Sequence, residues 1–152
     1  MTETRFDPEL YELIPHRPPM LLINHVHDLN KNRSEAIVTC DEESPFYQSE
    51  GGGVPSWIGL EYMGQTAALI AGYQLKHGLS KPHLGFLLGA RDYKVEVAYF
   101  KAGENLLVKC AEAALVGESL ATFDCTIESL ETKQQLASAN LSVFRKPIEN
   151  NI

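Results

Sequence analysis

Residues 55–75 constrain the fold most, because they read as a helix that is apolar on almost every side. Their sequence is PSWIGLEYMGQTAALIAGYQL, and Glu61 is the one charged residue in it. A helix without a polar face lies in a core rather than on a surface, and burying an unpaired carboxylate is costly. The presence of Glu61 in a core helix therefore indicates a catalytic function for this residue. An ion pair with Arg17 or Arg91 is the structural alternative.

The residues before this helix predict a short helix and two strands. Residues 7–13 read as a helix with Asp7 as its N-cap and a proline in the first turn. Residues 21–29 and 34–40 read as strands. Residues 41–54 read as a loop.

The chain after the helix is rich in alternating apolar residues and predicts further strands. Short turns separate the runs, so we expect an antiparallel meander. The expected strands are residues 83–100, 104–115, 118–130 and 134–146. One long helix followed by strands is an α+β order, and a single antiparallel sheet curved around the helix would bury most of it. Its remaining side needs a second copy, so we expect at least a dimer.

Small residues recur along the helix and permit a close approach of the sheet or of a ligand. Each glycine costs about 1 kcal/mol inside a helix, which is easier to accept where close packing requires it. These residues are Gly59, Gly64, Ala67, Ala68, Ala71 and Gly72.

Composition limits the class of protein and its partners. A chain of 152 residues is most simply one domain, here residues 1–152. The net charge of −7 disfavours nucleic acid and anionic membranes as partners. The three cysteines are far apart and odd in number, which argues against a disulfide framework and a CxxC site. We therefore expect a cytoplasmic protein that binds neither nucleic acid nor membrane.

Four segments resemble bacterial 3-hydroxyacyl-acyl-carrier-protein dehydratases. They are IPHRPPM at residues 14–20, SPFYQ at 44–48, PSWIGLEYMGQ at 55–65 and FKAGE at 100–104. The resemblance implies a hot-dog fold, in which an antiparallel sheet wraps a central helix, and a dimer with active sites at the interface. It also places Glu61 on the catalytic acid of the family.

One departure from the family pattern concerns the loop before the helix. The family has its catalytic histidine there, whereas residues 49–53 read SEGGG. The chain therefore resembles the divergent branch linked to aryl-polyene synthesis. No loop residue inherits the role of the base.

Dehydration of a 3-hydroxyacyl thioester needs a base at C2, donors for the enolate and an acid at the 3-hydroxyl. We assign the acid to Glu61 and the base to His16, which lies between prolines; a structural role for His16 is the alternative. The resemblance implies that this motif histidine is mainly structural and lies near the site.

The start of the helix supplies the candidate substrate-binding residues. Its free amides carry partial positive charge, so the amides of Ser56 and Trp57 are predicted oxyanion donors. Gly52 and Gly53 are the reserve. Trp57 and Gln65 are each four residues from Glu61, so a stripe lining an acyl tunnel is predicted. Core or dimer packing is the alternative for Trp57 and Gln65.

The sequence predicts no metal and no cofactor. His25 and His27 share one face of a strand, but no third ligand is evident, and dehydration transfers no electrons. His83 has a small prospect of a role in the site.

The leading hypothesis for function is dehydration of 3-hydroxyacyl thioesters on acyl carrier protein to trans-2-enoyl thioesters. The pathway would be fatty-acid, aryl-polyene or polyketide-type synthesis. A hot-dog acyl thioesterase is one alternative. A non-catalytic acyl-binding subunit of a heteromeric dehydratase is another. Acyl carrier protein is the expected partner, and the assembly is a homodimer or a heterodimer with a related subunit.

Overall fold

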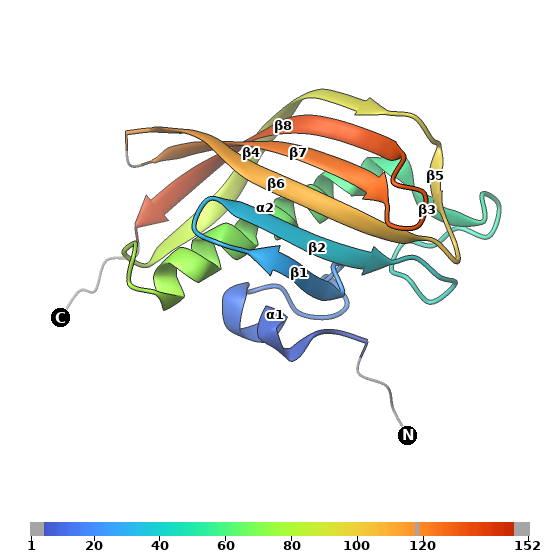
Figure 1. The fold of residues 1–152 in the computed structure, drawn as a ribbon, viewed down its shortest axis with the longest axis horizontal. Helices are drawn as coiled ribbons and strands as arrows, with labels where there is room; N and C mark the ends of the chain where they lie inside the picture. Colours follow the sequence, from blue (N-terminus) through green and yellow to red (C-terminus); the bar gives the residue numbers. More distant parts are fainter. Residues whose placement is uncertain (1–4, 118, 148–152) are drawn as a thin grey trace.

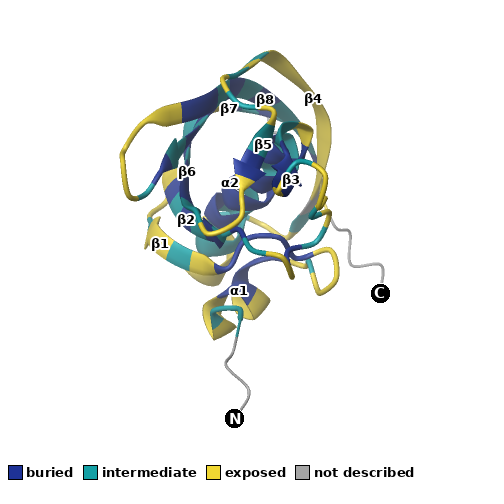
Figure 2. Cartoon of the chain, turned by 90° about the vertical axis from the view of Figure 1, so that its right-hand side faces the viewer, coloured by how far each residue is buried: buried dark blue, intermediate teal, exposed yellow. Residues whose placement is uncertain are grey.

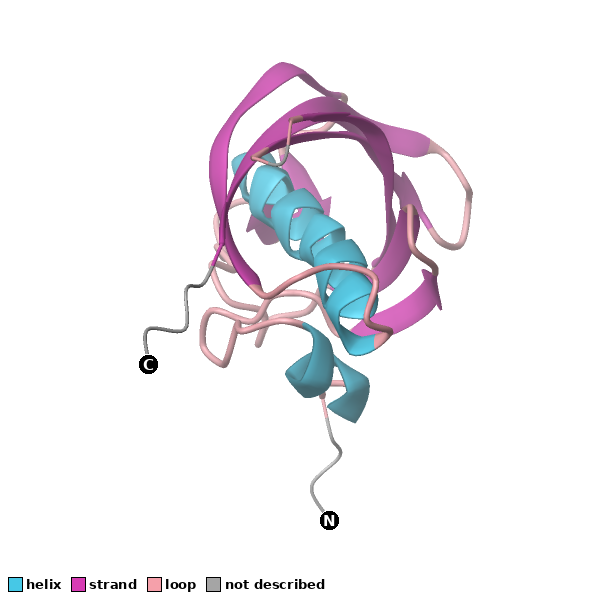
Figure 3. Cartoon of the chain, turned by 90° about the vertical axis from the view of Figure 1, so that its left-hand side faces the viewer, coloured by secondary structure: helices cyan, strands magenta, loops and turns pink. Residues whose placement is uncertain are grey.

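The computed structural model describes residues 5–117 and 119–147. In it a curved sheet surrounds one long helix, α2, on several sides (Figures 1 and 3). In chain order the elements are α1 (Pro8–Leu13), β1 (His25–Leu29), β2 (Arg33–Thr39), β3 (Gly53–Pro55), the 3-10 turn η1 (Ser56–Ile58), α2 (Gly59–Lys76), β4 (His83–Val95), β5 (Tyr99–Lys101), β6 (Asn105–Val116), β7 (Leu120–Ser129) and β8 (Gln135–Pro147). The predicted α+β class with a wrapped central helix is confirmed.

The large sheet has the strand order β1-β2-β6-β7-β8-β4, and each neighbouring pair is antiparallel. Only β6, β7 and β8 form the predicted meander. β4 instead crosses to the far edge and pairs with β8, so the prediction of a simple four-strand meander was wrong. The connection between β2 and β4 contains α2 itself, so the strands before and after this helix lie at opposite ends of the strand order.

Three predicted element boundaries also differ from the structure. The strand expected over residues 83–100 is two strands, because β5 leaves the large sheet and pairs with β3. The first strand begins at His25, since residues 21–24 are buried against the core in irregular backbone. The α-helix begins at Gly59, after Pro55 has ended β3 and η1 has made one tighter turn.

The core lies between α2 and the strands β2 and β6. Eight residues of α2 are buried, and Figure 2 shows the helix inside the ring of strands. Two side chains of the sheet also bond to the helix: the Ser34 hydroxyl donates to the Thr66 carbonyl at 2.6 Å, and the Cys110 thiol donates to the Met63 carbonyl at 3.4 Å. These contacts fix which face of α2 meets the sheet.

α1 covers the outer side of α2 near its C-terminal half. Asp7 accepts from the Glu9 amide as the predicted N-cap. Gly72 has no room for a side chain, because a Cβ there would collide with the backbone of Leu13. Within the described part of the chain, no helix has the length and hydrophobicity needed to cross a lipid bilayer.

Candidate active site

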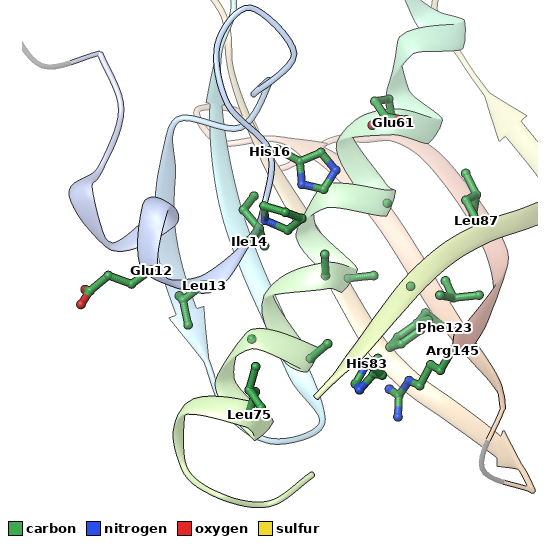
Figure 4. A pocket seen from close by; sticks show the side chains of 18 residues that line it. Glu12, Leu13, Ile14, His16, Glu61, Leu75, His83, Leu87, Phe123 and Arg145 are labelled. Carbon is green, nitrogen blue, oxygen red and sulfur yellow. The ribbon is translucent and has the colours of Figure 1, made fainter. Parts of the chain in front are cut away.

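A cavity of about 430 Å³ lies between α2, the segment after α1 and the strands β4, β7 and β8 (Figure 4). Its volume is typical of small-molecule sites, about 300–1,000 Å³. Small residues of α2 form one wall, and mostly apolar side chains form the other. The lining residues are Glu12, Leu13, Ile14, Pro15, His16, Glu61, Gly64, Ala67, Ala68, Ala71, Gly72, Leu75, His83, Gly85, Leu87, Phe123, Val143 and Arg145.

The two predicted catalytic side chains, His16 and Glu61, lie at the same end of this cavity (Figure 4). Glu61 is in the first turn of α2. His16 belongs to the proline-rich segment that follows α1. The structure thus brings together two residues that are far apart in the sequence.

Arg17 holds the His16 segment in place and does not pair with Glu61. Its guanidinium donates to the carbonyls of Ile14 and His16 at 2.8 Å each, and to that of Tyr11 at 2.9 Å. None of the ion pairs found among the described residues includes Glu61. The structural alternative of an ion pair with Arg17 or Arg91 therefore finds no support in the structure.

Burial is the main influence on the charge state of His16. It lowers the pKa of the imidazole below the ordinary value of 6.5, the nearby Glu61 raises it in part, and Arg17 lowers it further. The Nδ1 atom is buried and has no hydrogen-bond partner among the described residues. A neutral imidazole at pH 7 has a free lone pair, which a base requires.

Gln65 lies beside Glu61 but does not line the cavity. Its Oε1 accepts from the Leu22 amide at 2.9 Å, and its Nε2 donates to the Met20 carbonyl at 2.8 Å and to Glu61 Oε1 at 3.2 Å. Gln65 is fully buried. It therefore fastens residues 20–22 to α2 and orients the Glu61 carboxyl, in contrast to the predicted contact with substrate.

Trp57 also departs from the predicted stripe. Its side chain is 62% exposed and packs edge-on against Phe46, with ring centroids 6.2 Å apart. The reason is the 3-10 turn, where about three residues make a turn, so the four-residue spacing to Glu61 no longer means a shared face. Of the three side chains of the predicted stripe, only that of Glu61 lines the cavity.

Most of the predicted oxyanion donors are already engaged in backbone hydrogen bonds. The Ser56 amide donates to the Ala98 carbonyl at 2.9 Å. The amides of Gly52 and Gly53 donate at 3.3 Å to Ser49 and Gln48 in a tight turn. These three amides are not available to an oxyanion in this structure, so the prediction that they bind it is corrected. The Trp57 amide remains the proposed donor, because the first amides of a helix lack partners within it.

The glycines of this loop serve close packing. A Cβ at Gly53 would collide with the backbone of Phe100 on the neighbouring strand, and one at Gly51 would enter the ring of Tyr99. Gly52 has φ +66, which suits its turn. The run of glycines therefore has a structural explanation in the pairing of β3 with β5.

The far end of the cavity holds Arg145, which the sequence did not single out, and His83, for which it gave a small prospect of a role in the site. Arg145 on β8 is 8% exposed, and His83 at the start of β4 lies beside it (Figure 4). Alternation along β8 gave the available signal: Leu141, Val143 and Arg145 share one face, so an inward charge was readable. The partner strands that close the cavity were not.

Other candidate polar groups lie elsewhere. His27 Nε2 lies 3.9 Å from Glu35 Oε1. Within residues 5–117 and 119–147, no three or more His, Cys, Asp or Glu side chains cluster in a way that would hold a metal ion. Cys40, Cys110 and Cys125 are buried free thiols.

Comparisons with known proteins agree on one family. A family model described as ApeP dehydratase, ApeP-like, matches residues 8–152. A 3-hydroxyacyl-(acyl-carrier-protein) dehydratase FabZ from Anaeromyxobacter dehalogenans (strain 2CP-C) is 34% identical over 84 residues, which are 53% of this chain and 54% of the relative. The chain thus spans about half the length of that curated relative.

Solved structures share the whole architecture. The dehydratase heterocomplex ApeI:P from Xenorhabdus doucetiae matches with a TM-score of 0.81 and 26% identity, over 92% of this chain and 91% of that chain. A hypothetical thioesterase with coenzyme A from Streptococcus pneumoniae TIGR4 matches with a TM-score of 0.63 and 11% identity, over 83% and 88% of the two chains. The second likeness shows the fold alone. Together they confirm the predicted hot-dog fold.

Proposed function

Because the chain belongs to the ApeP-like dehydratase family, we propose that it dehydrates 3-hydroxyacyl thioesters carried on acyl carrier protein to trans-2-enoyl thioesters. The observation that carries this proposal is the pairing of His16 and Glu61 at one end of an apolar cavity. Fatty-acid or aryl-polyene-type synthesis is the proposed setting. The FabZ name of the curated relatives supports the substrate class.

In the proposed mechanism, neutral His16 takes the C2 proton and an enolate of the thioester forms. Its negative charge is stabilised by a backbone amide of η1, the 3-10 turn that leads into α2, and we propose the amide of Trp57. The 3-hydroxyl leaves as water with a proton from Glu61, and the C2–C3 double bond forms. The proton on His16 then returns to Glu61, so that the pair is restored.

Gln65 has a positioning role in this proposal. Its amide donates to Glu61 Oε1 at 3.2 Å while both of its other bonds are to fixed backbone. The carboxyl is thereby held toward the cavity. A general acid needs this alignment, because proton transfer requires hydrogen-bond reach of the leaving group.

The proposed assembly is a pair of hot-dog subunits, with residues 1–152 forming one of them. The β4 strand ends the sheet, and it exposes Phe86, Leu87 and Leu88. Apolar side chains on an unpaired edge favour addition of another chain. The ApeI:P relative, a heterocomplex, supports a related but different subunit as the partner. The three buried free thiols fit the cytoplasm.

The test is conversion of a 3-hydroxyacyl thioester by the purified chain, alone and with its partner subunit, followed by mass spectrometry. We expect loss of one water in the native protein. Replacing Glu61 by Gln keeps the shape and removes the acid, so the rate should fall about 10²–10⁴-fold. Exposed Glu50→Gln, the matched control, should keep full activity.

The alternatives give other outcomes in the same assay. Free thiol released from a saturated acyl thioester would identify a thioesterase. No reaction of either substrate, even with the partner present, would identify a non-catalytic acyl-binding subunit. Unchanged dehydration by the Glu61→Gln protein would reject the assigned acid.

A further inference from the structure

A largely buried arginine side chain at the far end of the cavity lacks a hydrogen-bond partner among the described residues. Arg145 lies opposite the His16 and Glu61 end (Figure 4). It is 8% exposed, and its Nη2 atom is buried without a hydrogen bond to any described residue. None of the ion pairs found within residues 5–117 and 119–147 includes it. An uncompensated buried charge is expensive, so this end of the cavity fits a ligand that supplies the missing acceptor.

The wall between the two ends offers no competing charge. It is formed by alanines of α2 and by Leu87, Phe123 and Val143. Glu12 also lines the cavity, but its carboxylate is directed away (Figure 4) and lies 3.9 Å from the Lys76 ammonium. An apolar chain can therefore occupy the middle of the cavity and leave Arg145 facing its end.

The length of the cavity wall formed by α2 suits an acyl chain. The small-residue face of α2 runs from Glu61 to Gly72, a rise of roughly 16 Å at about 1.5 Å per residue. A chain whose thioester lies at Glu61 extends along this face. Its remote end then meets the guanidinium.

We infer that Arg145 binds an oxygen acceptor, a carboxylate or a hydroxyl, at the end of the acyl chain remote from the thioester. This inference rests on the proposed function, because it takes the thioester to lie at Glu61. Arg145 is then a residue that selects substrate and takes no part in the chemistry. The guanidinium fork matches a carboxylate best, since it can donate two parallel hydrogen bonds.

A phosphate of the carrier arm is the other source of such an oxygen. The burial of Nη2 favours the acyl end, because a carrier-linked phosphate stays at the entrance, where solvent reaches. The two sources are separable by experiment, since a pantetheine ligand without phosphate retains the acyl end and lacks the other group.

The test measures binding of pantetheine analogues, each with and without the phosphate of the carrier arm, in which an amide replaces the thioester. Their saturated chains have equal length and end in a carboxylate, a hydroxyl or a methyl group, and calorimetry gives each Kd. We expect the carboxylate-ended ligand to bind at least tenfold more tightly than the methyl-ended one. Arg145→Met should abolish this preference, and Arg145→Lys should keep part of it.

Lys146→Met is the matched control. Lys146 is the next residue on β8 and is exposed, outside the cavity lining, so its loss removes the same charge and should leave all three affinities unchanged. Thermal melting of each variant checks folding, and the Lys variant keeps the test decisive where the Met variant does not fold.

Equal binding of the three ligands by the native protein would overturn the inference. So would an Arg145→Met effect confined to ligands that carry a phosphate. Because the ligands cannot react, the result is independent of catalysis. A preference that persists in a protein without dehydratase activity would support the role of Arg145 and reject the proposed function, whereas dehydration without a preference would do the reverse.

Discussion

The two faces of α2 are built from different residues and do different work. The side of α2 away from the cavity carries large buried side chains, among them Met63, Leu69 and Ile70, none of which lines the cavity. The face toward the cavity carries Gly64 and alanines. One helix therefore fills space on one side to hold the fold together and leaves space on the other for a ligand. The fold tolerates a hollow because the packed face stabilises it.

The glycines of α2 make the same comparison within one face. A Cβ at Gly64 would meet nothing within 4 Å, whereas one at Gly72 would collide with the Leu13 backbone. Gly64 thus faces the open cavity, whereas Gly72 lets the last residue of α1 pack directly against α2. Two glycines of the same helix therefore have different roles, because one faces an open cavity and the other faces the backbone of α1.

The largest effect on stability is expected on the packed face. Leu69 is fully buried, so Leu69→Ala should lower the free energy of unfolding by about 2–5 kcal/mol through lost burial and a new void. Denaturant titration measures the change. A loss as small as that of an exposed residue would mean that this face is not the one that stabilises the fold.

The next effect is expected where the helix meets Leu13. Gly72→Ala places a methyl group against rigid backbone, and overpacking of this kind costs about 1–3 kcal/mol. Chemical denaturation would give the value. A stabilised Gly72→Ala protein would show that the contact with Leu13 is looser than the structure has it.

The matched substitution at Gly64 should have a smaller effect of opposite sign. Its Cβ has room, and alanine is favoured over glycine in a helix by about 1 kcal/mol. Gly64→Ala should therefore raise the midpoint of thermal unfolding slightly. A destabilised variant would indicate that this wall of the cavity is packed in the assembled protein.

The smallest effect is expected from protonation of His16. Since its folded pKa lies below 6.5, the unfolded chain binds the proton more readily, and stability is complete above pH 6.5 and falls as the pH drops through the folded value. His16→Gln should lose less stability than the native protein between pH 7 and 5. Melting temperatures of the two proteins at several pH values measure this difference. An equal fall in both proteins would contradict the partial burial of this imidazole.

Much of the fold was readable from the sequence because it rests on local patterns. An apolar helix is buried and alternating apolar runs form strands, so the two patterns together predict the α+β class. The sequence also singled out Glu61, because a lone carboxylate in a buried helix indicates a function, and the structure places this residue at the cavity. Gly64 follows Glu61 by three residues and Ala68 follows it by seven, about two helical turns, so the three residues share one face of the helix.

Tertiary structure alone decided what lies opposite that face. The sequence put Trp57 and Gln65 in the site, but a 3-10 turn rotated the first outward and backbone partners claimed the second. The family resemblance implied that His16 lies near the site, but no sequence pattern placed Arg145 at the other end of the same cavity. Helix spacing is fixed by geometry along the chain, whereas the contents of a cavity depend on which distant strands close around it.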